Sequence, residues 1–153
     1  MDIRAATFSD AEGMKVVHDE IFAAGLRKAP GDLAQVLTSY IEPDNGIGCF
    51  VAVDEDGRIL GFQSLRHAWP DNPYGVAEGW GIIGTHVSPR AARQGVGSGL
   101  FRATLEAARA AGLAKIDASI GADNVLGQAY YEAMGFRTYR TPEGLVCKAY
   151  RID

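Results

Sequence analysis

VSPRAARQGVGSGLF, residues 87–101, places three glycines at alternate positions directly before a stretch with helical periodicity. Glycine weakens a helix by up to about 1 kcal/mol relative to alanine, so a helix start of this kind needs a reason. The preceding segment 79–87 is apolar and predicts a buried strand. A strand, a glycine-rich turn and a helix N-terminus favour phosphate, because free N–H groups and the helix dipole point at it. The glycines alone are equally compatible with a plain turn.

The elements on either side of this stretch alternate between strand and helix patterns. After it we expect a helix over 97–111, a strand over 115–120, a helix over 124–134 that Gly135 ends, and strands over 136–140 and 145–152. Before it we expect a strand over 3–7, two helices, a hairpin around the turn 54–57 and a loop over 69–75. The order predicts one mixed α/β domain over residues 1–153, with a mostly antiparallel sheet and helices on both faces.

The two N-terminal helices have recognisable boundaries. Ser9 and Glu12 have the spacing of a capping box, and Gly25 follows the last apolar position of the first helix. We expect its apolar face to be Met14, Val17, Ile21 and Phe22. The second helix is expected over 32–41, with inward-facing Leu33, Val36, Leu37 and Tyr40.

Composition excludes several classes of protein. Hydrophobic residues make up 47% of the 153-residue chain and charged residues 22%, which is typical of a globular domain and not of a disordered one. The net charge of −4 argues against a nucleic-acid surface. No His or Cys cluster has metal-ligand spacing, and Cys49 and Cys147 are interpreted as buried free thiols. Without an apolar signal region or a membrane-spanning run, we expect a cytoplasmic protein with no membrane contact.

Other phosphate motifs do not fit residues 87–101, but one family pattern does. Leu100 stands where the dinucleotide fingerprint needs its third glycine, and no Gly-Lys-Ser/Thr follows. The stretch resembles the coenzyme A loop of the GNAT superfamily of N-acetyltransferases, V-x-P-x-x-R-G-x-G-x-G/A followed by two apolar residues. The matching positions are Val87, Pro89, Gly95, Gly97, Leu100 and Phe101. Ala92 and Arg93 replace the usual Arg or Gln and the following Gly, so Arg93 or Gln94 is left to supply the side-chain contact.

A second block, NVLGQAYYEAMGF (124–136), resembles the N-x-x-A-x-x-x-Y-E-x-x-G-F helix of the same family. It matches at Asn124, Tyr131, Glu132, Gly135 and Phe136, with Gly127 in place of the alanine. The preceding IGADN is similar to phosphinothricin-type acetyltransferases. Asn124 and Tyr131 are two helical turns apart and are expected on one face. The core face is expected to comprise Leu126, Tyr130, Ala133 and Met134.

The resemblance implies acetyl-CoA as co-substrate, no metal, and direct attack of an amine on the acetyl group. It implies a sheet that splays at the end of the loop strand, so that the backbone of Thr85, His86 and Val87 pairs with the pantetheine amides. Asn124 is the further pantetheine contact that it implies, and Tyr131 the acid that protonates the thiolate. The pyrophosphate would lie on the backbone of residues 93–98, comprising Arg93, Gln94, Gly95, Val96, Gly97 and Ser98.

The base and the acceptor stay open at the level of sequence. The base is Glu78, His86 or a water relay. The acceptor is a primary amine of a small molecule or peptide, expected between the first two helices and the 69–74 loop. Its pocket has candidate aromatic walls and cations in Trp69, Tyr74, Trp80, Arg27 and Lys28. A homodimer is compatible with the sequence. The alternative function is a non-catalytic acyl-CoA-binding sensor or partner module on the same fold.

Overall fold

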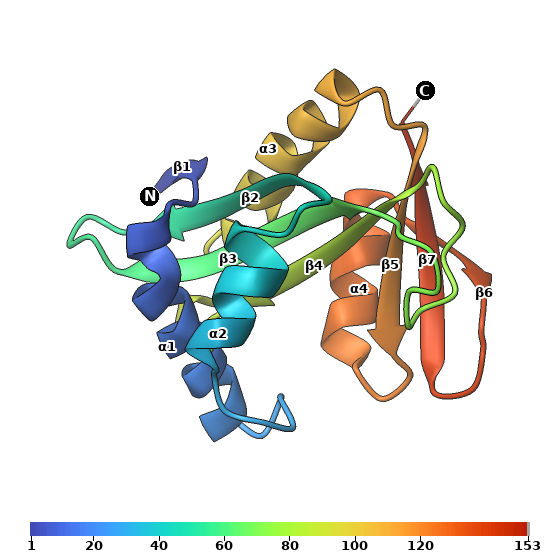
Figure 1. Cartoon of the computed structure of the whole chain (residues 1–153). Helices are drawn as coiled ribbons and strands as arrows, with labels where there is room; N and C mark the ends of the chain where they lie inside the picture. Colours follow the sequence, from blue (N-terminus) through green and yellow to red (C-terminus); the bar gives the residue numbers. More distant parts are fainter. Residues whose placement is uncertain (153) are drawn as a thin grey trace.

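A seven-stranded sheet runs through the molecule in the order β1-β2-β3-β4-β5-β7-β6 (Figure 1). The computed structural model describes residues 1–152. All neighbouring strands are antiparallel except β4 and β5, which are parallel. The strands are β1 (Asp2–Ala5), β2 (Gly46–Val53), β3 (Ile59–His67), β4 (Gly81–Val87), β5 (Lys115–Gly121), β6 (Arg137–Arg140) and β7 (Leu145–Arg151). The predicted fold class and element order are therefore confirmed.

Helices cover both faces of the sheet, and strand alternation explains why. The helices are α1 (Ala11–Ala23), α2 (Leu33–Val36), α3 (Val96–Ala110) and α4 (Val125–Met134). In β2, Val51 and Val53 pack with α1, whereas Ala52 between them packs with α3 on the opposite face. Figure 1 shows α1 and α2 on the near side of the β1–β4 half of the sheet, with α3 behind it. The second predicted helix continues α2 as a π-helical turn over Leu37–Ile41.

The sheet opens between β4 and β5. These strands pair only at Gly81 with Ile116 and at Ile82 with Asp117. On its other edge β4 stays paired with β3 as far as Val87. The second half of β4 therefore has no strand neighbour on its β5 side, and its backbone groups there are free for another partner. The splay that the family resemblance implied is present.

The start of α1 differs from the prediction. Thr7, not Ser9, precedes the first turn, a 3-10 turn over Phe8–Asp10, and its backbone N–H donates to the Asp10 carboxylate at 2.8 Å. Glu12 takes no part in this cap, because the capping box is made by Thr7 and Asp10 on the 3-10 turn that precedes α1. Phe22 is also exposed, at 42%, whereas Ile21 beside it packs against the core. Gly25 follows α1 with φ +77°, as a helix-ending glycine should.

The buried face of α4 also differs from the prediction. Asn124 is the N-cap, and its Oδ1 accepts from the Gly127 N–H at 2.9 Å. Leu126 is 69% exposed and Ala133 is exposed as well, whereas Tyr131 is buried in the core with Phe136. The expected core face was therefore wrong for Leu126 and Ala133, whereas Tyr130 and Met134 pack against the core as predicted. Gly135 ends the helix with φ +108°, as predicted.

Three further features concern the described residues 1–152. Cys49 is half-buried and Cys147 is buried, and both are free thiols. No group of three His, Cys, Asp or Glu side chains in this part of the chain is arranged as a metal site. None of its helices has both the length and the apolar composition needed to cross a membrane.

Candidate active site

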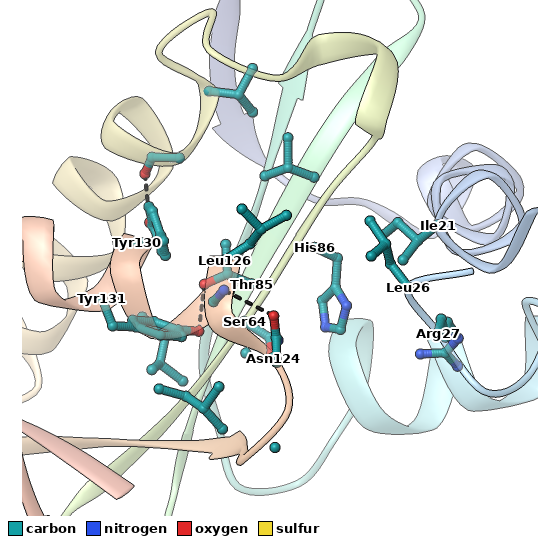
Figure 2. A pocket seen from close by; sticks show the side chains of 18 of the residues that line it. Ile21, Leu26, Arg27, Ser64, Thr85, His86, Asn124, Leu126, Tyr130 and Tyr131 are labelled. Carbon is teal, nitrogen blue, oxygen red and sulfur yellow. Dashed lines mark hydrogen bonds between the residues drawn. The ribbon is translucent and has the colours of Figure 1, made fainter. Parts of the chain in front are cut away.

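A cavity of about 940 Å³ lies at the opening between β4 and β5 (Figure 2). One wall, which we call the cofactor wall, is formed by the 88–98 loop and the first turns of α3 and α4. The opposite side, the acceptor wall, is formed by the end of α1, the following residues Leu26 and Arg27, Tyr40, and the 69–74 loop. The outer half of β4 is the floor that both walls share. The cavity thus joins the free edge of β4 to the start of α3.

The backbone of the cofactor wall is shaped to expose N–H groups. Arg93 has φ +63° and Gly95, the residue before α3, has φ +78°. The N–H groups of the first helical turn that follows have no partner within the helix. A side chain at Gly95 would meet nothing within 4 Å, so this glycine faces open space. Arg90 anchors the loop, because it donates to Glu20 and to the Ile59 carbonyl, both at 2.9 Å.

The other two glycines of the motif serve packing. A Cβ on Gly97 would lie 2.5 Å from Cε1 of Tyr130, so α3 and α4 approach closely at this point. A Cβ on Gly99 would lie 3.3 Å from Ile3 in β1. The space beside Gly97 is thus taken by Tyr130 and that beside Gly99 by Ile3, although the backbone of Gly97 still lines the cavity. Sequence could not separate these roles, since they depend on which neighbour faces each Cα.

A chain of hydrogen bonds connects the cofactor wall with β4. Tyr130 donates from its hydroxyl to the Gly97 carbonyl at 2.8 Å, and Gln63 Nε2 donates to the Tyr130 oxygen at 3.0 Å. Gln63 Nε2 also donates to Thr85 Oγ1 at 2.9 Å, and Thr85 Oγ1 lies 2.7 Å from the Tyr131 hydroxyl. Tyr130 is therefore more than a packing residue, because it ties the start of α3 to the floor of the cavity.

Both tyrosines line the cavity and stay protonated at neutral pH. Burial is the main cause that raises the pKa of Tyr130 to about 12 and the pKa of Tyr131 further above its usual value. Tyr131 is 6% exposed, while its hydroxyl is held at the junction of α4 and β4 (Figure 2). A buried phenol with one known partner is a proton donor that the cavity can use.

The predicted cofactor contacts fall into two groups. Thr85, His86, Val87, Asn124 and Tyr131 line the cavity, as do the loop and helix-start residues Arg93, Gly95, Val96, Gly97 and Ser98. Gln94 does not line it, and its amide instead donates to the Arg90 carbonyl at 3.4 Å. Of the two candidates for replacing the missing arginine at Ala92, only Arg93 thus faces the cavity.

The acceptor wall contains some of the expected side chains. Arg27, Trp69 and Tyr74 line it, whereas the exposed Lys28 and Glu78 do not. Trp80 instead packs against Tyr139, with the rings tilted by 32° and their centroids 5.1 Å apart. Arg27 is partly tied down, because it donates to the Ala29 carbonyl at 2.9 Å and to Gln35 at 3.0 Å. No Asp or Glu is among the lining residues of the described chain, so the acceptor wall is positively charged.

One residue of this region was missed by the sequence analysis. His18 in α1 is fully buried, and its Nε2 lies 3.1 Å from Nδ1 of His86. Burial, followed by the charge of Arg27, lowers the pKa of His18 to about 4, and burial lowers that of His86 as well. The signal was available, because His18 shares the helical spacing of Met14, Val17 and Ile21.

Comparisons with known proteins agree with this architecture. A GCN5-related N-acetyltransferase from Kribbella flavida superposes with a TM-score of 0.78 at 23% identity, over 98% of this chain and 96% of that one. A protein assigned as a phosphinothricin N-acetyltransferase gives 0.77 at 18% identity, over 99% and 98%. A protein assigned as an acetyltransferase from Salmonella typhimurium, solved with its cofactor acetyl-CoA, gives 0.70 at 18% identity, over 99% and 94%. A comparison with curated protein sequences found no significant match.

Residues 16–136 match the sequence model of the acetyltransferase (GNAT) family. The matched region runs from α1 through the end of α4, and so includes both walls and the floor of the cavity. The open β4–β5 edge, the helix start and the buried tyrosine all lie within it. This chain therefore belongs to the GNAT family of acetyltransferases.

Proposed function

We propose that the protein transfers an acetyl group from acetyl-CoA to a primary amine of a small molecule or peptide, by direct attack. One observation carries this proposal: the hydroxyl of Tyr131 reaches the same cavity as the free edge of β4 and the N-terminus of α3. Such a transfer needs three parts: a strand edge that binds the arm of the cofactor, a site for its phosphates, and a proton donor for the leaving thiolate.

Acetyl-CoA is the acyl donor of this family, and the cofactor wall fits it. Alternate residues of β4 face β3, and the register of the two strands gives His86 to that side, so the free backbone N–H and carbonyl groups offered to an amide-bearing arm are those of Thr85 and Val87. The helix start after Gly95 offers N–H groups to a pyrophosphate, with Arg93 beside it. Asn124 uses Oδ1 to cap α4, which leaves its side-chain NH₂ group as the donor to the arm.

Tyr131 is the acid of the proposed reaction. Gln63 donates to Thr85 Oγ1, so the Thr85 hydroxyl has its own hydrogen to give to the Tyr131 oxygen, 2.7 Å away. In that arrangement Tyr131 keeps its own hydrogen free to protonate the leaving thiolate. Because the pKa of Tyr131 is raised, the phenol is protonated whenever the thiolate departs.

The amine has no carboxylate base in the cavity. Glu78 is exposed and outside the lining, and none of the lining residues within 1–152 is acidic. Of the three alternatives, this arrangement counts against Glu78 and leaves His86 or a water relay, and the positively charged wall favours the neutral form of a bound amine.

The test is release of free thiol from acetyl-CoA in the presence of a panel of primary amines, with mass spectrometry of the product. We expect amine-dependent thiol release and an acetylated amine. A protein that binds acetyl-CoA by calorimetry yet acetylates no amine, free or N-terminal in a peptide, would contradict the proposal and favour a non-catalytic acyl-CoA-binding module.

A further inference from the structure

The two histidines, of which His18 is buried and His86 half-buried, form a pair that the proposed reaction does not yet use. The ring of His86 stacks on Phe62 at 4.7 Å and meets His18 edge-on at 4.6 Å. Tyr40 closes the other side, 5.2 Å from His86 and 5.7 Å from His18. Both rings are neutral at pH 7, since burial lowers both pKa values. Each ring therefore has one N–H and one lone pair.

The surroundings of His18 decide which nitrogen carries each proton. Its Nδ1 is buried and has no hydrogen-bond partner. If His86 donated to His18 Nε2, then His18 Nδ1 would be a buried N–H without an acceptor. If His18 donates instead, Nδ1 is an unpaired lone pair, which is the less costly of the two. His18 Nε2–H therefore donates to His86 Nδ1, and His86 carries its own proton on Nε2.

That Nε2–H faces a notch on the acceptor side of the cavity. His86 Nε2 lies 3.5 Å, and Ser64 Oγ 3.4 Å, from the position that a Cβ on Gly84 would take. Gly84 and Ser64 are cross-strand partners, and all three residues line the cavity. Within residues 1–152, neither His86 Nε2 nor Ser64 Oγ makes a hydrogen bond to the protein. The missing side chain at Gly84 thus leaves a space beside two free donors, and Figure 2 shows the side chains of His86 and Ser64 at the cavity.

We propose that this notch, formed by His86 Nε2–H, Ser64 Oγ and the bare Cα of Gly84, binds an oxygen of the amine acceptor. His86 is then a positioning residue that holds the acceptor, with its tautomer fixed by His18, and it is not the base. This inference rests on the proposed function. The acceptor class is an amine with an oxygen acceptor close to its nitrogen, because two donors in a small space reject a purely apolar amine.

The charges around the notch favour acceptors whose oxygen belongs to an anionic group. Arg27 and Arg66 both line the cavity on this side, and no acidic lining residue opposes them. Arg66 lies over the ring of Trp69 at 4.2 Å, which holds its guanidinium in place. The oxygen has two sources with the same chemistry: the carboxylate of a free amino acid, or the first carbonyl of a peptide with a free N-terminus. Both place the oxygen at the same separation from the amine.

Nitrogen NMR tests the tautomer without any turnover. Long-range ¹H–¹⁵N spectra at pH 7.5 are expected to show His86 protonated at Nε2 and His18 protonated at Nε2. Adding leucinamide in the presence of coenzyme A should shift the His86 Nε2 resonance, whereas isoamylamine, which lacks the oxygen, should not. Protonation of His86 at Nδ1, or equal shifts with both amines, would overturn the proposal. In His18→Phe the His86 tautomer is expected to become mixed.

Acetylation kinetics test the oxygen with leucine, leucinamide and isoamylamine, which share one apolar side chain. In the wild type we expect kcat/KM for the better oxygen-bearing amine to exceed that for isoamylamine by about 100-fold. Preference for leucine identifies the carboxylate source, and preference for leucinamide the peptide carbonyl. Relative to the wild type, His86→Leu should lower this ratio by about tenfold, and the double variant with Ser64→Ala should lower it by about 100-fold. Amine basicity cancels, because it is the same for every variant.

The control is Leu26→Ala, which removes an apolar side chain from the acceptor wall and leaves the notch intact. It should lower kcat/KM for all three amines by a similar factor. A ratio that survives in the double variant would overturn the proposal even if all amines are acetylated. If no amine is acetylated, the proposed function fails, and the NMR titration still decides whether the notch binds the oxygen.

Discussion

The two walls of the cavity are built in different ways, although they share β4 as their floor. The cofactor wall presents backbone groups: the free edge of β4, where it parts from β5, and the first N–H groups of α3. The acceptor wall presents side chains from distant segments, such as Arg27, Tyr40 and Trp69. A backbone site constrains the chain locally and leaves a motif, whereas a side-chain site is assembled only by the fold. The cofactor wall can thus be recognised from the sequence, whereas the acceptor wall becomes visible only in the structure.

The largest effect is expected where the two walls meet, at Tyr131. Tyr131→Phe keeps the ring in the core and removes only the hydroxyl that lies 2.7 Å from Thr85. Loss of a positioned acid should lower kcat by about 10²- to 10⁴-fold. Acetyl-CoA affinity by calorimetry should change little, and the free energy of unfolding should fall by about 1 kcal/mol for the lost hydrogen bond.

Tyr130→Phe is the matched control for Tyr131→Phe. It also removes one phenol hydroxyl from α4, but this hydroxyl holds the Gly97 carbonyl at the start of α3. We therefore expect weaker acetyl-CoA binding and a much smaller fall in kcat. Equal kcat values for the two variants, with chemistry shown to be rate-limiting, would remove Tyr131 from the role of acid.

The next prediction concerns the stability of the fold at low pH. It bears on the acceptor side of the cavity, because the histidine pair lies there. The pKa of His18 is lowered to about 4 in the folded state, chiefly by burial and then by Arg27. As pH falls below about 6.5, the unfolded chain takes up the proton first, so folding stability drops between pH 6.5 and about 4. His18 alone should account for about 3 kcal/mol of this loss.

Urea unfolding at a series of pH values measures this loss. In His18→Phe the slope of stability against pH should decrease, while the part due to His86 remains. An unchanged slope would show that the folded protein protonates His18 as easily as the unfolded chain does, and the pair would then be more open to water than its burial indicates.

The packing on the cofactor side is tested by Gly97→Ala. The new Cβ would lie 2.5 Å from Cε1 of Tyr130, so α3 and α4 have to move apart. We expect a loss of about 1–3 kcal/mol in the free energy of unfolding, together with weaker acetyl-CoA binding. Gly99→Ala is the matched control, because its Cβ would lie 3.3 Å from the flexible end of Ile3. If both variants unfold at the same urea concentration, the close approach of the two helices is not what requires glycine.

Much of the fold followed from local patterns because its boundaries are local. Gly135 and Gly25 were identified correctly as helix ends, since a helix-ending residue with positive φ favours glycine wherever it stands. The start of α1 was misplaced because both Thr7 and Ser9 are good N-cap residues, and only the 3-10 turn at Phe8–Asp10 chooses between them. Such a choice depends on how the helix docks on the sheet, which no local pattern contains.

The site divides in the same way. Tyr131 could be predicted as a site residue from its family motif, but its burial could not, because the helix rotation was assigned from Leu126, which is exposed. His18 and His86 are 68 positions apart in the sequence and meet only because α1 packs across β4. Ser64 is placed beside them by the register of β3 and β4, which pairs it with Gly84. Contacts that depend on strand register and helix docking cannot be predicted from the spacing of residues along the sequence.

The smallest effect is expected at Arg93, where the cofactor wall depends on a side chain and no longer on backbone. Arg93 lines the cavity, is exposed, and has φ +63°. Because Arg93→Ala keeps a Cβ, the backbone cost of this conformation is unchanged and only the charge is lost. Loss of a screened phosphate contact of this kind should raise KM for acetyl-CoA by about two- to fivefold at low salt, and less at 0.5 M salt.

The matched control is Arg102→Ala, which removes an exposed charge on α3 outside the lining and should leave KM unchanged at both salt concentrations. If the two variants show the same salt dependence, Arg93 does not replace the arginine that the family carries at the position of Ala92. The cofactor wall would then bind its phosphates through backbone alone, which would make the contrast with the acceptor wall complete.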